Sequence, residues 1–371
     1  MTKKIISAIV CVFLLAFCLF FANETPSAYA NTERGMAVIE RDSGRVLYSY
    51  NENAKLPMAS TTKIATCITV IENANLDEVV TIPQSAVGIE GSSIYLKKGE
   101  KLTVRQLLYG LMLRSGNDCA VALALHVGKS VENFAKKMNE TAIKAGATNT
   151  NFVNPHGLHD DNHYTTALDL ARISAYAMKN KDFYEIVSTK QKRIPNGEEE
   201  YERTLLNKNK ILYRVEGADG FKTGYTKKAG RCLVSSATRN GMNVICVVLN
   251  CPDMFERSEK LLDTAFLEYE LVEIVSRSSI VEAEVEGGKT KTVGLSPSAE
   301  FYYPLKEDEK NKIKIEVSGV KNMSAPVKIG TKNGKFEVFL DKQLLFSDNL
   351  FTIYNVEGKS LLDKIKDFWQ N

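Results

Sequence analysis

Residues 57–63 read Pro-Met-Ala-Ser-Thr-Thr-Lys and lead into an apolar pattern that continues to about residue 73. Isoleucines recur there at a spacing of four and three, which predicts a helix that begins near Ser60. Side chains at i and i+3 of a helix share one face, so the Lys63 amine can reach the Ser60 hydroxyl. A serine becomes a useful nucleophile when a base takes its proton, and a desolvated lysine near other cations can be that base. The stretch therefore predicts a catalytic Ser-x-x-Lys pair.

A second motif, Ser-Gly-Asn at residues 115–117, falls in a short turn between two predicted helices. Groups in such a turn can point into a cleft. Ser115 offers a hydroxyl that can relay a proton to or from the lysine. Asn117 offers an amide that can hold both Lys63 and a substrate carbonyl.

A third motif, Lys-Thr-Gly at residues 222–224, occurs once, just before strand-like residues. Lys222 supplies positive potential and Thr223 a hydroxyl for a substrate carboxylate. Gly224 lets a substrate backbone approach the strand closely. A second Ser-x-x-Lys (318–321) and a second Ser-x-Asn (347–349) lie in a β-rich segment, where i and i+3 face opposite sides, and no Lys-Thr-Gly follows them. The ordered triple of Ser60, Ser115 and Lys222 is therefore the functional one.

The elements around these motifs predict helices packed on an antiparallel sheet. Short strands are expected at Met36–Glu40 and Arg45–Tyr50, and again at Arg231–Thr238 and Met242–Asn250. Between the two strand pairs the sequence predicts helices at Ser60–Asn73, Val104–Leu113, Asn117–Val127, Val131–Ala145 and Thr166–Met178, with a last helix at Phe255–Tyr269. Thr103 and Gln106 form a capping box before one of them.

The chain divides into four segments. Residues 1–30 are expected to be a signal peptide: two lysines precede an apolar run, and Ala28-Tyr29-Ala30 offers a cleavage site. An uncleaved anchor is the alternative. Residues 31–270 form the catalytic domain. Residues 271–357 form an all-β domain, with strands expected at Ile280–Glu286, Ile313–Val317, Ala325–Ile329 and Lys335–Leu340.

Residues 358–371 predict an amphipathic helix that carries the single Trp of the chain. It is either an anchor that lies on a membrane surface or an ordinary helix docked on the β domain. With a signal peptide, the catalytic part is expected to be exported and to work on the extracytoplasmic face of the membrane or in the cell wall.

Composition excludes several functions. The 371 residues carry 48 Lys+Arg against 45 Asp+Glu, a net charge of +3, which is too mild for a nucleic-acid partner. Five of the seven cysteines lie beyond residue 30, an odd number without Cys-x-x-Cys spacing, so buried free thiols are expected rather than a disulfide framework or a metal site. No cofactor is expected.

The three motifs together resemble those of the penicillin-recognising serine acyltransferases, and more specifically the serine-type D-alanyl-D-alanine carboxypeptidases among the low-molecular-mass penicillin-binding proteins. Flanking residues match as well: 57–60, 113–118, 154–158 and 219–222. The resemblance is strong over about residues 33–269. Glycine at position 116 fits the carboxypeptidases rather than the class A β-lactamases.

The resemblance implies a mechanism and a substrate. Ser60 attacks the carbonyl of the penultimate D-Ala of a peptidoglycan stem peptide ending in D-Ala-D-Ala, and water then hydrolyses the acyl-enzyme. β-Lactams are expected to bind Ser60 covalently. The resemblance also gives Ser115 and Lys222 a part in protonating the leaving amine, and assigns the oxyanion hole to the backbone N–H groups of Ser60 and Tyr225.

The family holds the substrate's terminal carboxylate with an arginine just before the last helix. Arg257 matches that place, and Arg239 in the preceding turn is the second choice.

Three alternatives stay open at this point. A β-lactamase would share acylation but needs a water-activating carboxylate, and Glu202 to Asn207 has one residue too many for the class A element. A metallopeptidase would use His156, His159 and His163, whose spacing fits neither HExxH nor the usual zinc pairs. A non-catalytic wall-binding protein would keep the fold without its chemistry, which the intact Ser60, Lys63 and Lys222 argue against.

Overall fold

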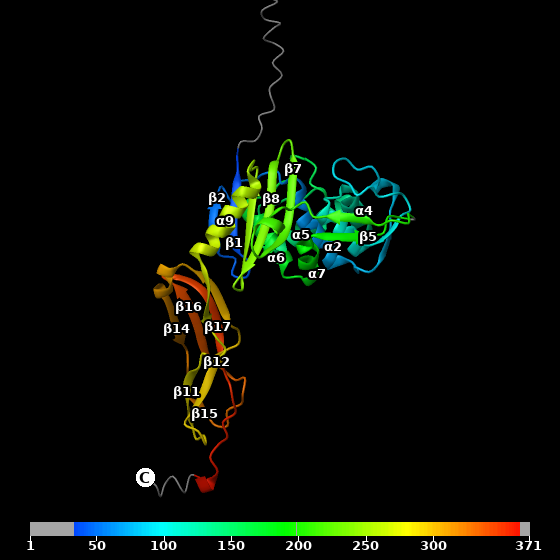
Figure 1. Ribbon diagram of the computed structural model, residues 1–371. Helices are drawn as coiled ribbons and strands as arrows, with labels where there is room; N and C mark the ends of the chain where they lie inside the picture. Colours follow the sequence, from blue (N-terminus) through cyan, green and yellow to red (C-terminus); the bar gives the residue numbers. More distant parts are fainter. Residues whose placement is uncertain (1–32, 198, 364–371) are drawn as a thin grey trace, which may run out of the picture.

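The computed structural model describes residues 33–197 and 199–363. Figure 1 shows two parts joined end to end: a larger part of helices around a sheet, and an elongated part built of strands. The expected signal peptide, and all of the expected terminal helix after Asp363, lie outside the described residues.

A five-stranded antiparallel sheet in the order β2-β1-β9-β8-β7 organises the larger part. Its strands are β1 (Gly35–Glu40), β2 (Val46–Tyr50), β7 (Ala218–Thr226), β8 (Gly230–Arg239) and β9 (Met242–Leu249). Every residue of β9 is buried, because helices cover both faces of this central strand. Both expected strand pairs are confirmed, whereas β7 was not predicted as a strand, and it carries the Lys-Thr-Gly motif inside it.

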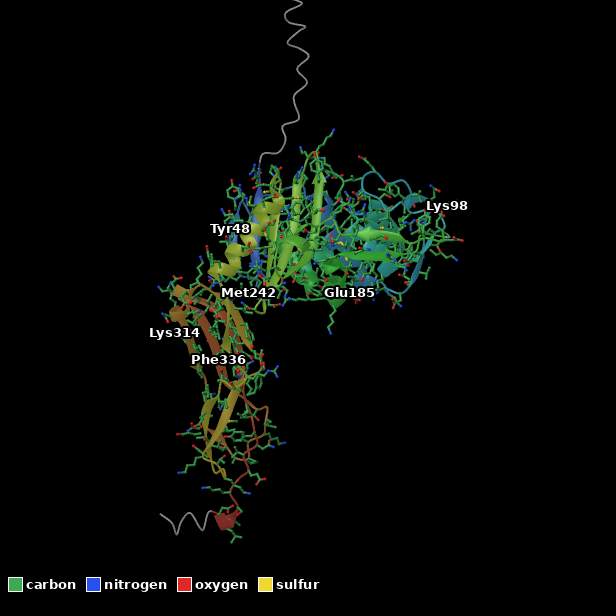
Figure 2. All side chains as sticks on the ribbon, viewed as in Figure 1. Tyr48, Lys98, Glu185, Met242, Lys314 and Phe336 are labelled. Atoms are coloured by element: carbon green, nitrogen blue, oxygen red, sulfur yellow. The ribbon has the colours of Figure 1, made fainter. Side chains whose placement is uncertain are left out.

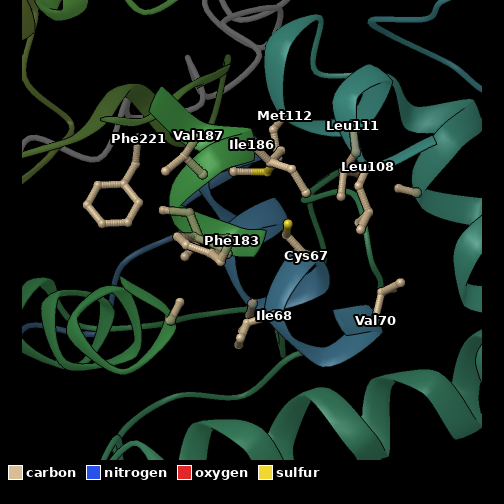
Figure 3. Close-up of a cluster of buried hydrophobic side chains, with 14 of the residues drawn as sticks. Cys67, Ile68, Val70, Leu108, Leu111, Met112, Phe183, Ile186, Val187 and Phe221 are labelled. Atoms are coloured by element: carbon tan, nitrogen blue, oxygen red, sulfur yellow. The ribbon is translucent and has the colours of Figure 1, made fainter. Parts of the chain in front are cut away.

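Most helices pack on one face of the sheet and enclose the main hydrophobic core. They are α2 (Lys63–Asn73), α3 (Val104–Leu113), α4 (Asn117–Gly128), α5 (Val131–Lys144), α6 (Ala167–Met178) and α7 (Lys181–Ser188). Figure 3 shows side chains of both α2 and α7 in this core, among them Cys67 and Ile68 of α2 and Phe183 and Ile186 of α7. The burial of α2 is nearly complete from its start, with Lys63 to Val70 all buried. Lys63 therefore stands in the first turn of a helix that is buried from its start.

The opposite face of the sheet is covered by α9 (Met254–Glu268) and the short α8 (Ile211–Arg214), which share a second hydrophobic cluster with β8 and β9. Smaller elements complete the larger part. They are the 3-10 turns η1 (Ala59–Thr62) and η2 (Gln84–Ala86), the antiparallel pair of β3 (Val79–Thr81) with β4 (Lys101–Thr103), and the hairpin of β5 (Gln191–Ile194) with β6 (Arg203–Leu206). The capping box is confirmed: Thr103 Oγ1 accepts from the Gln106 N–H, and Gln106 Oε1 accepts from the Thr103 N–H. Helix α7, helix α8 and the β5–β6 hairpin were not predicted.

The second part is built of strands around its own core. A six-stranded sheet has the order β14-β16-β17-β12-β11-β15, and β10 pairs with β13. The bounds are β10 (Glu270–Val275), β11 (Val281–Glu286), β12 (Thr292–Pro297), β13 (Phe301–Leu305), η3 (Glu307–Lys312), β14 (Ile313–Ser318), β15 (Met323–Ser324), β16 (Lys332–Leu340) and β17 (Gln343–Thr352).

One expected strand of this part is wrong. Residues 325–329 form no strand, and only Val327 makes an isolated bridge, to Val356. Pro326 explains the difference, because proline has no N–H to donate to a ladder.

The two parts meet at Arg45, just before β2. Its guanidinium donates to the Pro304 carbonyl and to Glu309, each at 2.5 Å, and lies 5.1 Å from the ring centres of Tyr269 and Tyr303. Figure 2 places Met242 at this end of the sheet, next to the elongated part. The junction is distant from the motifs on α2, α4 and β7.

Two further features of the described chain are the state of the cysteines and the length and apolar character of the helices. The five cysteines beyond residue 30 are all buried and unpaired, as expected. Within the described ranges, none of the helices combines the length and the apolar character needed to cross a membrane.

Candidate active site

Ser60 lies in η1, one turn before α2, and not inside the helix as the sequence predicted. Ala59 before it has a φ of +48°, which turns the chain sharply into the 3-10 turn. The Thr61 and Thr62 hydroxyls donate to the carbonyls of Met58 and Ala59, at 2.6 and 2.8 Å. These bonds fix the backbone on both sides of Ser60.

Lys63 is fully buried beneath Ser60 and meets three oxygens. Its Nζ lies 3.1 Å from Ser60 Oγ, 2.7 Å from Asn117 Oδ1 and 2.6 Å from the His156 carbonyl oxygen. The last two oxygens only accept hydrogen bonds, so a neutral amine donates its two hydrogens to them and keeps its lone pair for the third direction. The lone pair then points to the Ser60 hydroxyl, which can donate a hydrogen bond to it.

Burial sets the protonation of the two motif lysines. Desolvation, reinforced by the positive charge of Lys222, lowers the pKa of Lys63 well below its ordinary value of 10.5. Desolvation, with a smaller effect of Lys208, lowers the pKa of Lys222 to about 7. Lys63 therefore loses its proton far more easily than a surface lysine does, as a base for Ser60 must.

The second motif brings Ser115 to the cleft that Ser60 lines, and Asn117 to Lys63 beneath Ser60. Ser115 is buried at φ +65° and lines the cleft beside Ser60, but among the described residues its hydroxyl makes no hydrogen bond to Lys63 or Lys222. The Asn117 amide nitrogen donates to the Glu90 carbonyl, which orients the amide oxygen toward Lys63.

Asp118, next to the motif, holds a loop against the cleft. Its buried carboxylate accepts from the backbone N–H groups of Ile94 and Leu96 and from the Ser93 hydroxyl, at 2.6 to 3.3 Å. The Asn117 N–H also donates to the carbonyl of Ser92, at 2.7 Å. Ser92 thereby joins the cleft lining, which the motifs alone did not indicate.

Strand β7 forms the opposite wall. Lys222 is buried and its Nζ donates to the Thr223 carbonyl at 2.8 Å, while Thr223, Gly224 and Tyr225 line the cleft. A Cβ on Gly224 would lie 2.9 Å from the backbone nitrogen of Ser60. The glycine is thus needed for β7 to pack against the nucleophile turn, in addition to the substrate approach that the sequence suggested.

The expected carboxylate-binding arginines lie apart from each other. Arg257, in the first turn of α9, pairs with Asp253 at 3.3 Å and is not among the cleft-lining residues, although Met254 and Phe255 of the same turn are. Its Nε is buried without a partner among the described residues. Arg239 pairs with Asp263 at 2.7 Å and faces the junction with the strand-built part, so the structure separates this second choice from the cleft.

Several cleft residues were not predicted from sequence. They are Ser92, Lys208, Lys210, Arg231, Met254 and Phe255. The Lys-Asn-Lys of residues 208–210, shortly before the Lys-Thr-Gly motif, was the one available signal for the two lysines.

The histidine-rich loop supports the nucleophile turn. His163 Nδ1 accepts from the Val153 N–H at 3.1 Å, so its Nε2 carries the proton and donates to Thr62 Oγ1 at 2.8 Å. A Cβ on Gly157, at φ +87°, would collide with the Ala59 carbonyl. No three His, Cys, Asp or Glu side chains within residues 33–197 and 199–363 gather as a metal site. The loop acts as a brace behind Ser60, and both His163 nitrogens are used in it.

Known proteins share this arrangement. The family model described as D-alanyl-D-alanine carboxypeptidase matches residues 22–253, and the model described as penicillin-binding protein 5, C-terminal domain, matches residues 269–358. The chain belongs to the D-alanyl-D-alanine carboxypeptidase family. It is accordingly a serine-type carboxypeptidase of the penicillin-binding class, with the fold that the sequence predicted.

Individual relatives agree with the family model. D-alanyl-D-alanine carboxypeptidase DacF of Bacillus subtilis is 34% identical over 330 residues, covering 86% of this chain and 84% of that protein. The solved structure of penicillin binding protein 5 from Haemophilus influenzae is 30% identical, with a TM-score of 0.72, covering 87% of this chain and 97% of that one. A solved DD-transpeptidase of Streptomyces K15 is 36% identical, with a TM-score of 0.60, over 63% of this chain and 97% of its own length.

Among the described residues, the cleft of this carboxypeptidase lacks the feature that a β-lactamase would need, a carboxylate that activates water. Its lining residues within the described chain include no carboxylate. Glu202, the residue weighed for that role, is exposed next to β6 and outside the lining. The described lining of the cleft thus offers no counterpart of a dedicated water-activating carboxylate.

Acid should weaken the brace behind Ser60. Burial lowers the pKa of His163 from 6.5 to about 4, so on acidification the unfolded chain takes up this proton first. The free energy of unfolding is therefore expected to fall between about pH 6.5 and 4, with His163 contributing on the order of 3 kcal/mol. Urea unfolding across this range should show a shallower acid slope for His163→Gln, whose amide keeps both hydrogen-bonding functions.

His159→Gln is the matched control, because His159 is a partly exposed histidine of the same loop that pairs with Asp161. In this control, the free energy of unfolding should depend on pH as steeply as in the wild type. Equal slopes for wild type and His163→Gln would show that His163 is not the titrating group.

Proposed function

We propose that Ser60 attacks the carbonyl of the penultimate D-Ala of a peptidoglycan stem peptide, with Lys63 as the base. The three contacts of the Lys63 amine carry this proposal, since two acceptors leave its lone pair directed at the Ser60 hydroxyl. As the Ser60 oxygen forms its bond to carbon, its proton passes to Lys63 Nζ. The C–N bond then breaks, D-Ala leaves, and water hydrolyses the ester on Ser60.

The leaving amine needs a proton, and the negative oxygen of the tetrahedral intermediate needs donors. We assign the proton transfer to Ser115, which lies in the cleft beside Ser60, with the buried cation Lys222 lowering its cost. The backbone N–H groups of Ser60 and Tyr225 are the proposed oxyanion hole. The close packing of Gly224 on the backbone nitrogen of Ser60 supports this pairing, because it brings the two backbone segments together.

We place the terminal carboxylate of the substrate near Thr223 and Arg257. Thr223 lines the cleft, and Arg257 follows two cleft residues in the first turn of α9. Its buried, unpartnered Nε and its long 3.3 Å pair with Asp253 leave the guanidinium free to exchange partners.

Replacement of Ser60 by alanine tests the chemistry. Incubated with a labelled penicillin, the wild-type protein is expected to form a stable covalent adduct, and it should release D-Ala from a peptide ending in D-Ala-D-Ala whether or not a chelator is present. Ser60→Ala should lose both by at least about 10³-fold, because the nucleophile is gone. Mass spectrometry and a D-Ala assay measure the two outcomes.

Ser318→Ala is the control, because Ser318 belongs to the second Ser-x-x-Lys in β14. It should keep full activity. No adduct together with chelator-sensitive release would favour a metallopeptidase, and rapid penicillin turnover without D-Ala release would favour a β-lactamase.

We further propose that the protein is exported and acts on the extracytoplasmic face of the membrane. The signal-peptide pattern of residues 1–30 supports export, and the amphipathic pattern of residues 358–371 supports attachment to the membrane surface. Ser360 Oγ accepts from the Asp363 N–H at 3.2 Å, a bond that caps the beginning of such a helix.

Deletion of residues 360–371 tests the attachment. The truncated protein is expected to move from the membrane to the soluble fraction of fractionated cells while D-Ala release stays unchanged, since none of the described residues of this segment, 360–363, lines the cleft. Unchanged partitioning would contradict the surface anchor. N-terminal sequencing of the same preparations should begin at Asn31, and an intact Met1 would point to an uncleaved anchor.

A further inference from the structure

The cleft beside Ser60 is more cationic than binding of one terminal carboxylate requires. Lys208, Lys210 and Arg231 line it, in addition to Lys222 in the strand behind it, and its described lining includes no carboxylate. Arg231 pairs with Tyr225 across β7 and β8, so its side chain emerges on the same sheet face as that cleft residue. Lys210 precedes α8 and lies 5.8 Å from the ring centre of Phe255, another cleft residue.

Cations next to this cleft differ in how they are paired. Arg214 and Arg257, just outside the lining, pair with Glu256 of α9 and with Asp253, the residue before α9. In the described chain, Lys210 and Arg231 make no ion pair with any carboxylate. Lys208 donates to Ser92 at 3.3 Å and has a pKa lowered by burial, and this bond ties it to the loop that Asp118 holds. The two unpaired cations are therefore the ones available to a ligand.

We propose that Lys210 and Arg231 are specificity residues that bind a second carboxylate of the substrate, on the residue that precedes the D-Ala pair. The proposal rests on the proposed carboxypeptidase function. Thr223 and Arg257 are already assigned to the terminal carboxylate of the leaving D-Ala. The additional positive charge is therefore assigned to the other half of the peptide, which stays on Ser60 as the acyl group. Stem peptides with a free carboxylate there are better substrates than those in which it is amidated.

Partly exposed charges act by attraction at contact and by raising the local substrate concentration, and salt screens both effects. Each cation therefore contributes a moderate factor. The wild-type protein is expected to cleave the free-acid peptide with a kcat/KM about threefold to tenfold above that of its carboxamide. The difference should shrink in 0.5 M NaCl.

The test compares two peptides that both end in D-Ala-D-Ala and differ only in carboxylate or carboxamide on the preceding residue. The variants are K210Q, R231Q and their double, with K179Q/K260Q as a control that removes two exposed charges outside the cleft lining. The double variant should bring the ratio of the two kcat/KM values below about two. Its loss of kcat/KM should fall mainly on the free-acid peptide, and the K179Q/K260Q control should keep the wild-type ratio.

Three outcomes overturn the proposal while leaving the carboxypeptidase function intact: a wild-type ratio near one, a ratio unchanged in the double variant, or equal loss on both peptides. Equal loss would place the two cations at the terminal carboxylate instead. Failure of the proposed function is distinguishable, because wild-type protein would then release D-Ala from neither peptide.

Discussion

The burial of Lys63 is the constraint on which the site depends. An ammonium without solvent is costly, so a fully buried lysine is either matched by strong acceptors or neutral. Here two carbonyl-type acceptors satisfy the two hydrogens of a neutral amine, and the remaining contact is the Ser60 hydroxyl. Burial therefore lowers the pKa of Lys63, and the two acceptors direct the rest of its amine at the Ser60 hydroxyl.

Three separate parts of the chain must come together to build that environment. Helix α2 supplies the lysine, the Asn117 amide comes from the start of α4, and the His156 carbonyl comes from the loop after α5. Strand β7 adds the like charge of Lys222 and closes the other side. Glycines at positions 157 and 224 allow the loop and the strand to approach the nucleophile turn more closely than any side chain would permit. These backbone contacts hold the loop and the strand against the turn that carries Ser60.

The sequence predicted features set by neighbouring residues better than features that arise from tertiary packing. Residues 57–63 and the Thr103 capping box are local signals, and they placed α3 correctly and the start of α2 to within one turn. Strand β7 was missed because its aspartate, its lysine and its two glycines have low strand propensity, and pairing with β8 overrides that preference. Ser60, Lys63 and Asn117 could be brought together from their motifs, whereas Arg231 and Lys210 enter the cleft only through tertiary packing that no local spacing encodes. The orientation of Arg257 toward Asp253 likewise depends on how α9 begins.

The pH dependence of acylation tests the central claim most directly. The claim predicts that the second-order rate constant for reaction of Ser60 with penicillin rises with pH and levels off well below 10.5, because burial and Lys222 lower the pKa of Lys63. A rate constant that keeps rising tenfold per pH unit to beyond pH 9, as for a lysine of ordinary pKa, would contradict it.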